Sequence, residues 1–295
     1  MSEERERLIE LQKSQWQSLE KLCASLSLDE WEADTDCPTW TVKDCIAHLI
    51  GIEHRILGRD LPDINLHKMC HVRNEQGAKN EMDVVARREM TPAELLEEFS
   101  EVNSERWKVL NGQLDFSVEA DSPLGRGDVA DQVSVRVFDC WVHEQDIRRA
   151  IGKPGNLSGL TAQHSYERMT SVMPFVFGKK VSPPEGSSVR FKIYGESSFV
   201  LNIKVEEARA RFIRDLPEPT IYLEMDCETF MCLSCGRWDP DKVLGDRKVL
   251  IQGDQHLGIS IVKNMNFIEI YCKVNLFSNF NFSWIIHSTD NFFIF

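Results

Sequence analysis

The stretch Arg136-Val-Phe-Asp-Cys-Trp-Val-His-Glu-Gln-Asp-Ile-Arg-Arg149 decides how the N-terminal half of this chain is interpreted. Its apolar residues fit a buried helix, and Asp139, His143 and Asp146 follow one another at steps of four and three residues. Such steps place side chains on neighbouring turns of one helix face. Burying a carboxylate or an imidazolium without a partner costs on the order of several kcal/mol. We therefore expect a divalent metal as the partner of these side chains.

A third metal ligand is predicted earlier in the chain, in Trp40-Thr-Val-Lys-Asp-Cys-Ile-Ala-His-Leu-Ile-Gly51. Thr41 is a good N-cap, so a helix is expected to begin directly after it and to carry His48. Together with Asp139 and His143, this histidine completes a set of two imidazoles and one carboxylate. Many catalytic zinc sites use such a set and leave one position to water or substrate, and iron, nickel and manganese accept it as well.

Neighbouring polar residues have simpler interpretations. A histidine on a helix is more often a satisfied core or surface group than a ligand, and His54 points to a different face from His48, so we interpret it as a surface residue. Glu144 is turned by about 100° from His143 and is predicted to be solvated, or to contact the metal ligands from outside, and not to be a ligand itself. Asp146 is predicted to orient the imidazole of His143 by a hydrogen bond to the ring nitrogen that does not bind the metal. The alternative is an ion pair with Arg148 or Arg149.

Composition favours a folded chain that does not bind nucleic acid. The 295 residues are enough for about two domains, and a hydrophobic content of 42% is enough to build a core in each. The net charge of -13 argues against a nucleic-acid surface, because phosphate binding needs clustered lysine and arginine.

A cytoplasmic location is expected. The segment Met1 to Leu8 is charged and has no apolar signal region, and no run reaches the roughly eighteen apolar residues that span a bilayer. The nine cysteines are scattered and odd in number, which fits thiols in a reducing compartment better than a disulfide framework. Cys232-Leu-Ser-Cys235 is interpreted as part of a short helix, with a zinc or redox pair as the alternative.

The pattern of apolar residues changes along the chain. Helical periodicity predicts four helical regions in the first half, at residues 4–26, from 42 onward, 80–110 with a new start at Thr91-Pro92, and 131–151. In the second half, alternating residues predict strands at 189–193, 199–205, 221–225 and 248–254, with helices at 226–236 and 257–265. Strands combined with helices in this way favour an α+β domain.

The two metal-ligand segments carry a family resemblance. The chain resembles the mycothiol-dependent maleylpyruvate isomerase family, in which a metal lies between a histidine of a W-T-V-x-D-x-x-A-H-L segment and an acid-x-x-x-His pair on a later helix. Trp40 to Leu49 matches the first motif, with His48 at the ligand position, and Asp139 and His143 match the second. One departure is Asp139, since the resemblance implies a glutamate there, which is one methylene longer.

The resemblance also implies the fold class, α+β with two domains. Residues 1–165 would form a DinB-like four-helix bundle, and residues 170–267 a small sterol-carrier-like α/β sandwich, because the segment from Asp226 to Leu257 resembles that domain. The second domain would cover the metal cleft and supply Arg237 to grip a substrate carboxylate, with a surface arginine at a helix end as the alternative. Residues 268–295, rich in aromatic side chains, are predicted to lie outside the fold.

Two functional classes are compatible with these features. The first is a metal-dependent enzyme that uses a low-molecular-weight thiol as cosubstrate, since metal coordination deprotonates a thiol and the thiolate is the nucleophile. The resemblance implies thiol addition to maleylpyruvate, rotation about the new single bond, and elimination to fumarylpyruvate.

The second class is a non-catalytic binder of an apolar ligand with a structural metal. A structural zinc normally has four protein ligands and only three match here, which favours the enzyme. A metal-dependent hydrolase is the third choice. Zinc is the expected metal, and a small thiol and an electrophile are the expected partners.

Overall fold

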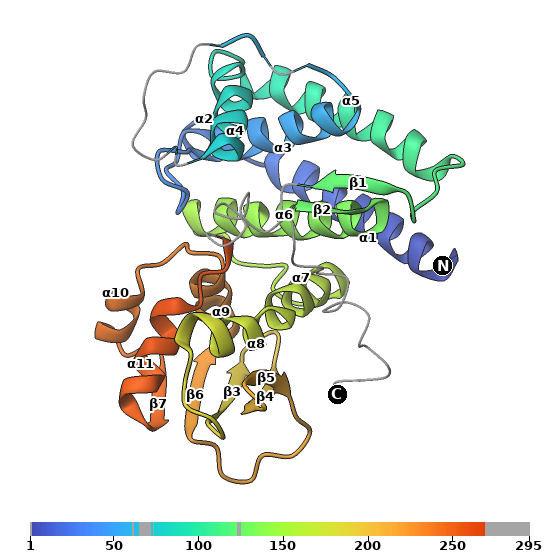
Figure 1. Ribbon diagram of the computed structural model, residues 1–295. Coiled ribbons are helices and arrows are strands. Elements are labelled where there is room, and N and C mark those ends of the chain that lie inside the picture. The colour runs from blue at the N-terminus through green and yellow to red at the C-terminus, as the bar shows by residue number, and fades with distance from the viewer. Residues whose placement is uncertain (1, 61, 65–71, 73, 123–124, 269–295) are drawn as a thin grey trace. The chain divides into compact units, whose positions relative to one another are not determined.

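The chain forms two compact units. The computed structural model describes residues 2–60, 62–64, 72, 74–122 and 125–268 (Figure 1). The first unit, Met1–Asn156, is mainly helical, and the second, Leu157–Phe295, contains a five-stranded mixed sheet. The predicted α+β class with two parts is therefore confirmed. The predicted domain limits, 1–165 and 170–267, stay a prediction, because a compact unit need not fold by itself.

Four long helices dominate the first unit. Its elements are α1 (Ser2–Cys23), α2 (Leu28–Trp31), α3 (Val42–Ile56), α4 (Glu75–Val85), α5 (Pro92–Asn111), β1 (Glu119–Ser122), β2 (Gly125–Asp128) and α6 (Val129–Ala150). Helices α1, α3, α5 and α6 pack against one another as a bundle (Figure 1). The predicted starts of α3 and α5 are confirmed, because Thr41 and Thr91 each form a capping box with the acid three residues later. The short α2 and the β1–β2 hairpin were not predicted.

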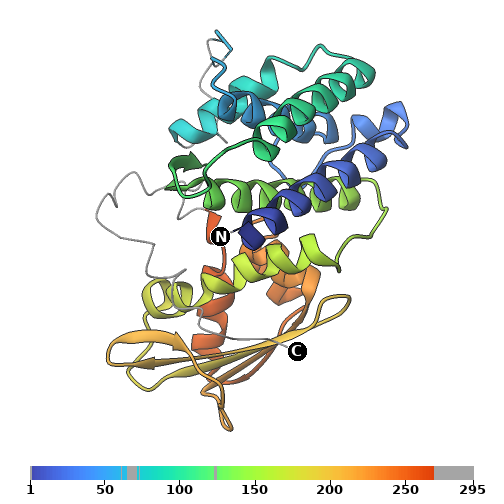
Figure 2. The ribbon, with the colours of Figure 1, turned by 90° about the vertical axis from the view of Figure 1, so that its right-hand side faces the viewer.

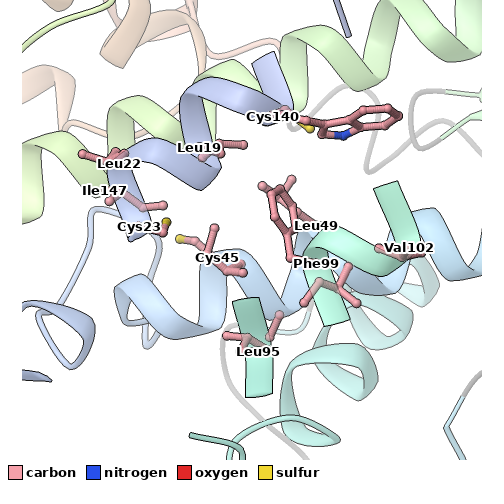
Figure 3. Packing of buried hydrophobic residues seen from close by; sticks show 14 of the residues in the cluster. Leu19, Leu22, Cys23, Cys45, Leu49, Leu95, Phe99, Val102, Cys140 and Ile147 are labelled. Carbon is pink, nitrogen blue, oxygen red and sulfur yellow. The ribbon is translucent and has the colours of Figure 1, made fainter. Parts of the chain in front are cut away.

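The core of this unit is an apolar cluster to which all four long helices contribute. Figure 3 shows Leu19 of α1, Leu49 of α3, Phe99 of α5 and Cys140 of α6 turned into one interior, and all four are fully buried. Burial of a large apolar side chain stabilises a fold by roughly 1.5–3 kcal/mol. This packing fixes α3 and α6 against each other and so positions the polar residues that they carry.

The second unit builds a sheet with the strand order β5-β4-β3-β6-β7. Its elements are α7 (Leu160–Ser171), α8 (Met173–Phe175), η1 (Val176–Val181), β3 (Ser188–Tyr194), β4 (Phe199–Glu206), β5 (Arg209–Phe212), β6 (Ile221–Asp226), α9 (Cys227–Ser234), α10 (Pro240–Gly245), β7 (Leu250–Gly253) and α11 (Gln255–Asn264). Strands β3 and β6 are parallel, and the other neighbours are antiparallel. The predicted β3–β4 hairpin is confirmed, whereas α7, α8, η1, β5 and α10 were not predicted.

Alternation along the strands gives the sheet one apolar face. Val189, Phe191 and Ile193 of β3 are buried, and Phe191 lies between its paired residues Leu201 of β4 and Leu223 of β6. Helices of this unit lie over one face of the sheet (Figure 2). Within the described ranges of the chain, no helix has the length and the apolar composition needed to cross a membrane.

The end of the described chain is held firmly. The backbone N–H of Phe267 donates to the carbonyl oxygen of Ser234 at 3.0 Å, and Phe267 is buried. The ammonium group of Lys180 donates to the carbonyl oxygen of Asn266 at 2.7 Å. These contacts make Asn266 and Phe267 part of the second unit. Of the predicted tail, 268–295, only residue 268 belongs to the described residues, and 269–295 lie outside them.

We expect a chain that ends after Ile268 to keep the unfolding temperature and helical content of the full chain. A control chain that ends after Lys263 loses the buried Phe267 ring, which should destabilise the second unit by about 3–5 kcal/mol, as removal of a buried aromatic side chain does. Thermal unfolding followed by circular dichroism measures both. Insolubility of the chain that ends after Ile268 would contradict the prediction.

Candidate metal centre

Helices α3 and α6 bring the three predicted ligands together. His48 Nε2 lies 3.5 Å from Asp139 Oδ2, and His143 Nε2 lies 3.6 Å from Asp139 Oδ1. One donor atom from each residue fits a group whose members all lie within 4.8 Å of one another. Metal–ligand bonds of about 2.0–2.2 Å place neighbouring ligand atoms of a tetrahedral site about 3.4 Å apart. The donor set therefore fits a divalent metal in both chemistry and spacing.

The surroundings give His48 and Asp139 the charge states that a metal requires. Burial lowers the pKa of His48 to about 4, against the opposing contact with Asp139, so this imidazole is neutral at pH 7. Burial raises the pKa of Asp139, but the contact with His48 and the charge of Arg136 outweigh it and hold that pKa well below its usual range. The side chain of Asp139 is also 23% exposed, whereas both histidines are buried. Asp139 is therefore the triad residue that solvent reaches most easily.

Asp146 holds His143 from behind. Its Oδ2 lies 3.1 Å from His143 Nδ1, while its Oδ1 accepts a hydrogen bond from Arg149 at 2.6 Å. Burial lowers the pKa of His143, but the hydrogen bonds with Asp146 and Cys37 outweigh it and raise the pKa to about 10. A metal at Nε2 would replace the proton there and leave the Nδ1 proton on the hydrogen bond to Asp146. Asp146 therefore makes both of the contacts considered for it, one with the His143 imidazole and one with Arg149.

Asp139 is also bound by a buried arginine that sequence reasoning missed. Arg136 Nη1 donates to Asp139 Oδ2, and its Nε donates to Glu53 Oε1 at 2.8 Å. Arg106 donates to the other oxygen of Glu53 at 3.0 Å. All but Asp139 are almost fully buried. The contact between Arg136 and Asp139 could have been predicted from the sequence, because residues three apart on a helix lie on the same face.

The ring of Trp40 packs against the two histidines in a tilted arrangement. Its ring centroid lies 5.0 Å from that of His48 and 6.0 Å from that of His143. The indole Nε1 donates to Glu81 Oε2 at 3.0 Å, which ties the ring to α4. The tryptophan of the W-T-V motif therefore shields one side of the triad, a role that its position before the helix did not reveal.

Two cysteines lie on the other side of His143. Cys37, Cys45 and His143 each offer a donor atom, and these atoms lie within 4.8 Å of one another. Cys37 Sγ is 3.9 Å from His143 Nδ1 and 3.3 Å from Asp146 Oδ2. His143 thus belongs to two candidate metal-binding groups, through opposite sides of its ring. Cys37 and Cys45 flank the start of α3, and their spacing matches no zinc motif, so sequence reasoning did not single them out.

Two titratable residues near the triad, Glu144 and His54, contact other side chains and do not contact the triad. Glu144 is fully buried, so its interpretation as a solvated group is wrong; it accepts hydrogen bonds from Gln15, Ser18, Arg148 and Asn156. Arg148 is a local partner one turn further along α6, but Gln15 and Ser18 come from α1, which the local helix pattern cannot reveal. His54 is half-buried and lies 3.2 Å from Glu98 Oε1, away from the triad, as its helix position predicts.

Arg237 lies in the second unit, just after α9. Its guanidinium donates to the carbonyl oxygen of Cys235 at 3.1 Å. Cys232 and Cys235 are buried at the end of α9, with Cys235 Sγ 3.9 Å from the sulfur of Met169, so they form part of a short helix end as predicted. The substrate-gripping role of Arg237 stays a prediction.

Replacing Asp146 with asparagine should weaken metal binding. Asparagine keeps the shape of the side chain but loses the charge that fixes the Nδ1 proton of His143, and removal of such partners costs about 10- to 100-fold in metal affinity. A zinc titration against a competing chelator measures the change. The exposed Glu97→Gln substitution removes one charge elsewhere on the unit and should leave the affinity unaltered. Equal affinities of Asp146→Asn and the parent would show that Asp146 does not support the ligand.

Comparison with known proteins supports the interpretation of this region. The model of the family "Mycothiol maleylpyruvate isomerase N-terminal domain" matches residues 13–148, which include all three predicted ligands. Residues 13–148 are therefore similar to such a domain. No curated protein sequence matches the chain closely enough to count as a relative.

Solved structures resemble the chain in fold. A crystal structure of the mycothiol-dependent maleylpyruvate isomerase is 12% identical, covers 84% of this chain and 92% of that chain, and superposes with a TM-score of 0.50. Sterol Carrier Protein 2 Like 2 from Aedes aegypti is 12% identical, covers 35% of this chain and 97% of that chain, with a TM-score of 0.29. Because the identity is only 12%, the match to the isomerase shows a shared fold and nothing more. The shared fold covers both the helical first unit and the second unit of this chain.

Proposed function

We propose that the chain is a metal-dependent enzyme that uses a low-molecular-weight thiol, as a thiol transferase or a cis–trans isomerase of the maleylpyruvate type. His48, Asp139 and His143 would hold a divalent metal, with zinc as the expected metal, although two imidazoles and a carboxylate also suit iron, nickel and manganese. The substrate class would be α,β-unsaturated acids, which accept a thiolate at the double bond. The saturated bond that results can rotate before the thiol leaves.

The observation that carries this proposal is a three-donor site with an open side. The donor atoms of the triad lie within 4.8 Å, and the side chain of Asp139 is 23% exposed, so a further ligand would approach the triad at this carboxylate. Catalytic zinc sites have three protein ligands and an open position, whereas structural sites are closed by four. The isomerase-type domain over residues 13–148 supports the same conclusion.

Each residue around the triad has a defined task in this proposal. When bound, a divalent metal supplies the positive charge that stabilises a thiolate near neutral pH. His48 contributes a neutral imidazole, and Asp139 an ionised carboxylate beside the open side. Asp146 keeps the Nε2 of His143 directed at the site, and Trp40 shields the two imidazoles from water.

The second candidate function is a binder with a structural metal. The group of Cys37, Cys45 and His143 favours it, because thiolates and imidazoles are the usual ligands of structural zinc, although a closed site needs a fourth ligand besides these three. Such a metal would have sulfur ligands from the protein itself, which gives the two candidates different spectra.

Adding a small thiol to the cobalt-substituted protein should produce a new sulfur-to-cobalt charge-transfer band, because the thiolate enters the open position. The band should be absent in His143→Ala, and turnover of maleylpyruvate-like acids should depend on both metal and thiol. A stoichiometric metal that no thiol perturbs, together with no turnover, would contradict the enzyme proposal.

A double variant, Cys37→Ser with Cys45→Ser, identifies the source of the sulfur. If the added thiol is the ligand, this variant keeps the thiol-dependent band. A band that is present before thiol is added, and that disappears in the double variant, would support the structural metal.

A further inference from the structure

We propose that Cys37 and Cys45 form a dithiol oxidation site directly behind His143, at which a peroxide closes a disulfide between them. Both residues are thiols in the structure. Their sulfur atoms belong to one group with a nitrogen of His143, in which all three atoms lie within 4.8 Å of one another. The site is separate from the triad, because it lies on the Nδ1 side of the imidazole, whereas the triad uses Nε2.

The two cysteines differ in access, and this sets the order of reaction. Cys37 is 7% exposed and is followed by the exposed residues Pro38 and Thr39, whereas Cys45 is fully buried in α3. A small oxidant such as hydrogen peroxide therefore reaches Cys37 first. Cys45 is then the neighbouring thiol that resolves the oxidised intermediate, as in redox-sensing cysteine pairs.

The chemistry balances with peroxide as the oxidant. The Cys37 sulfur attacks one peroxide oxygen, so that an S–O bond forms, the O–O bond breaks, and the thiol proton leaves with the hydroxide as water. The Cys45 sulfur then attacks the Cys37 sulfenic acid. An S–S bond forms, the S–O bond breaks, and the second thiol proton leaves as part of a second water. Two thiols are oxidised and one peroxide is reduced.

The loop that carries Cys37 connects the oxidation site to the triad. The thiol of Cys37 donates to Asp146 Oδ2 at 3.3 Å, and the Cys37 carbonyl oxygen accepts from the Trp40 N–H at 3.0 Å. Closing the disulfide removes that thiol donor and draws Cys37 away from Asp146, and it pulls on the segment that places Trp40 over the two histidines. The consequence, which rests on the proposed function, is that oxidation lowers metal affinity by about 10-fold, the lower end of the range for lost supporting contacts, because Asp146 still holds His143.

A metal held by the two sulfurs and His143 is the competing explanation of this cluster. It would need the Nδ1 atom of His143, which already lies 3.1 Å from Asp146 Oδ2 in a hydrogen bond. The disulfide uses only the two sulfur atoms and leaves that hydrogen bond in place. The observed contacts therefore favour oxidation over a second metal.

The test treats the reduced, metal-free full chain with stoichiometric peroxide. Cys70 and Cys272, which lie outside the described residues, are replaced by serine in every sample so that they do not compete. We expect the loss of two thiols, a cross-linked peptide that contains Cys37 and Cys45, and reversal by dithiothreitol. The Cys37→Ser substitution, at the slightly more exposed of two buried thiols, should abolish the cross-link, and Cys45→Ser should leave Cys37 as a sulfenic acid or its further oxidation products.

Two controls separate this proposal from the others. Cys23→Ser removes a different buried thiol of the same core and should leave the cross-link unaffected (Figure 3). His48→Ala disables the proposed metal centre and should still form the disulfide, so failure of the metal proposal does not affect this test. A cross-link between another pair of cysteines, or thiols at Cys37 and Cys45 that survive peroxide in folded protein, would overturn the oxidation site. Equal zinc affinity of the oxidised and reduced chains would overturn its coupling to the triad.

Discussion

Replacing His143 with alanine is expected to lower the zinc affinity of the chain by about a hundredfold or more. Structural zinc binding releases about 10–16 kcal/mol through four ligands, so one ligand contributes roughly 3 kcal/mol, which is about two orders of magnitude in affinity. His143 would also link a bound metal to Asp146, whose Oδ2 lies 3.1 Å from its Nδ1, and its removal abolishes that support too. A zinc titration against a chelator of known affinity measures the loss.

Other histidine and acid variants make the test specific. His48→Ala should cause a similar loss, because it removes the ligand that α3 supplies. His54→Ala is the matched control, since it removes a second histidine of α3 that contacts Glu98 instead of the triad. Asp139→Glu should retain metal, since it keeps a carboxylate at the same position. If His143→Ala and His54→Ala bind zinc equally well, the triad is not the metal site.

The ligand triad could be predicted from sequence because each of its parts is local. Asp139 and His143 are one turn apart on a single helix, so spacing alone placed them together. His48 followed from the Thr41 capping box, which fixed where α3 begins. Bringing α3 to α6 needed the resemblance to a known bundle, since periodicity does not say which helices pack together. The triad's role as a ligand set remains a prediction.

The surroundings of the triad could not be predicted, because their partners are distant in sequence. Arg136 meets Glu53 only after α6 packs on α3, and Glu144 meets Gln15 only after α6 packs on α1. A buried acid and a solvated one look alike in sequence when the partner lies on another helix. The grouping of Cys37 with His143 has the same origin.

Short elements were missed for a different reason. Strand β5 and helices α2, α8 and α10 are too short for a periodic pattern to stand out. Helix α7 has the length of an ordinary helix, but it begins after Gly159 without a side-chain cap, so the usual start signal is absent. Arg237 shows a further limit, because its proposed role depends on how two units meet, which no local pattern specifies.

Replacing Arg136 with methionine is expected to destabilise the metal-free protein by about 3–5 kcal/mol. Methionine keeps much of the apolar volume, but Asp139 and Glu53 lose a charged partner inside the fold, and breaking a buried ion pair has a cost of this size. Urea unfolding in the presence of a chelator measures the change. Arg7→Met is the control, because the Arg7–Glu4 pair is exposed and such pairs contribute about 0–1 kcal/mol.

Zinc should reduce this cost, and the size of the reduction tests the metal centre. In Arg136→Met, the carboxylate of Asp139 is no longer shared with a guanidinium, so a metal cation can take over as its partner. A ligand that binds only the folded state stabilises it in proportion to the logarithm of its affinity. The variant should therefore bind zinc more tightly than the parent and gain more stability at the same zinc concentration. If the difference in unfolding free energy between parent and variant is the same with and without zinc, the metal does not bind at Asp139.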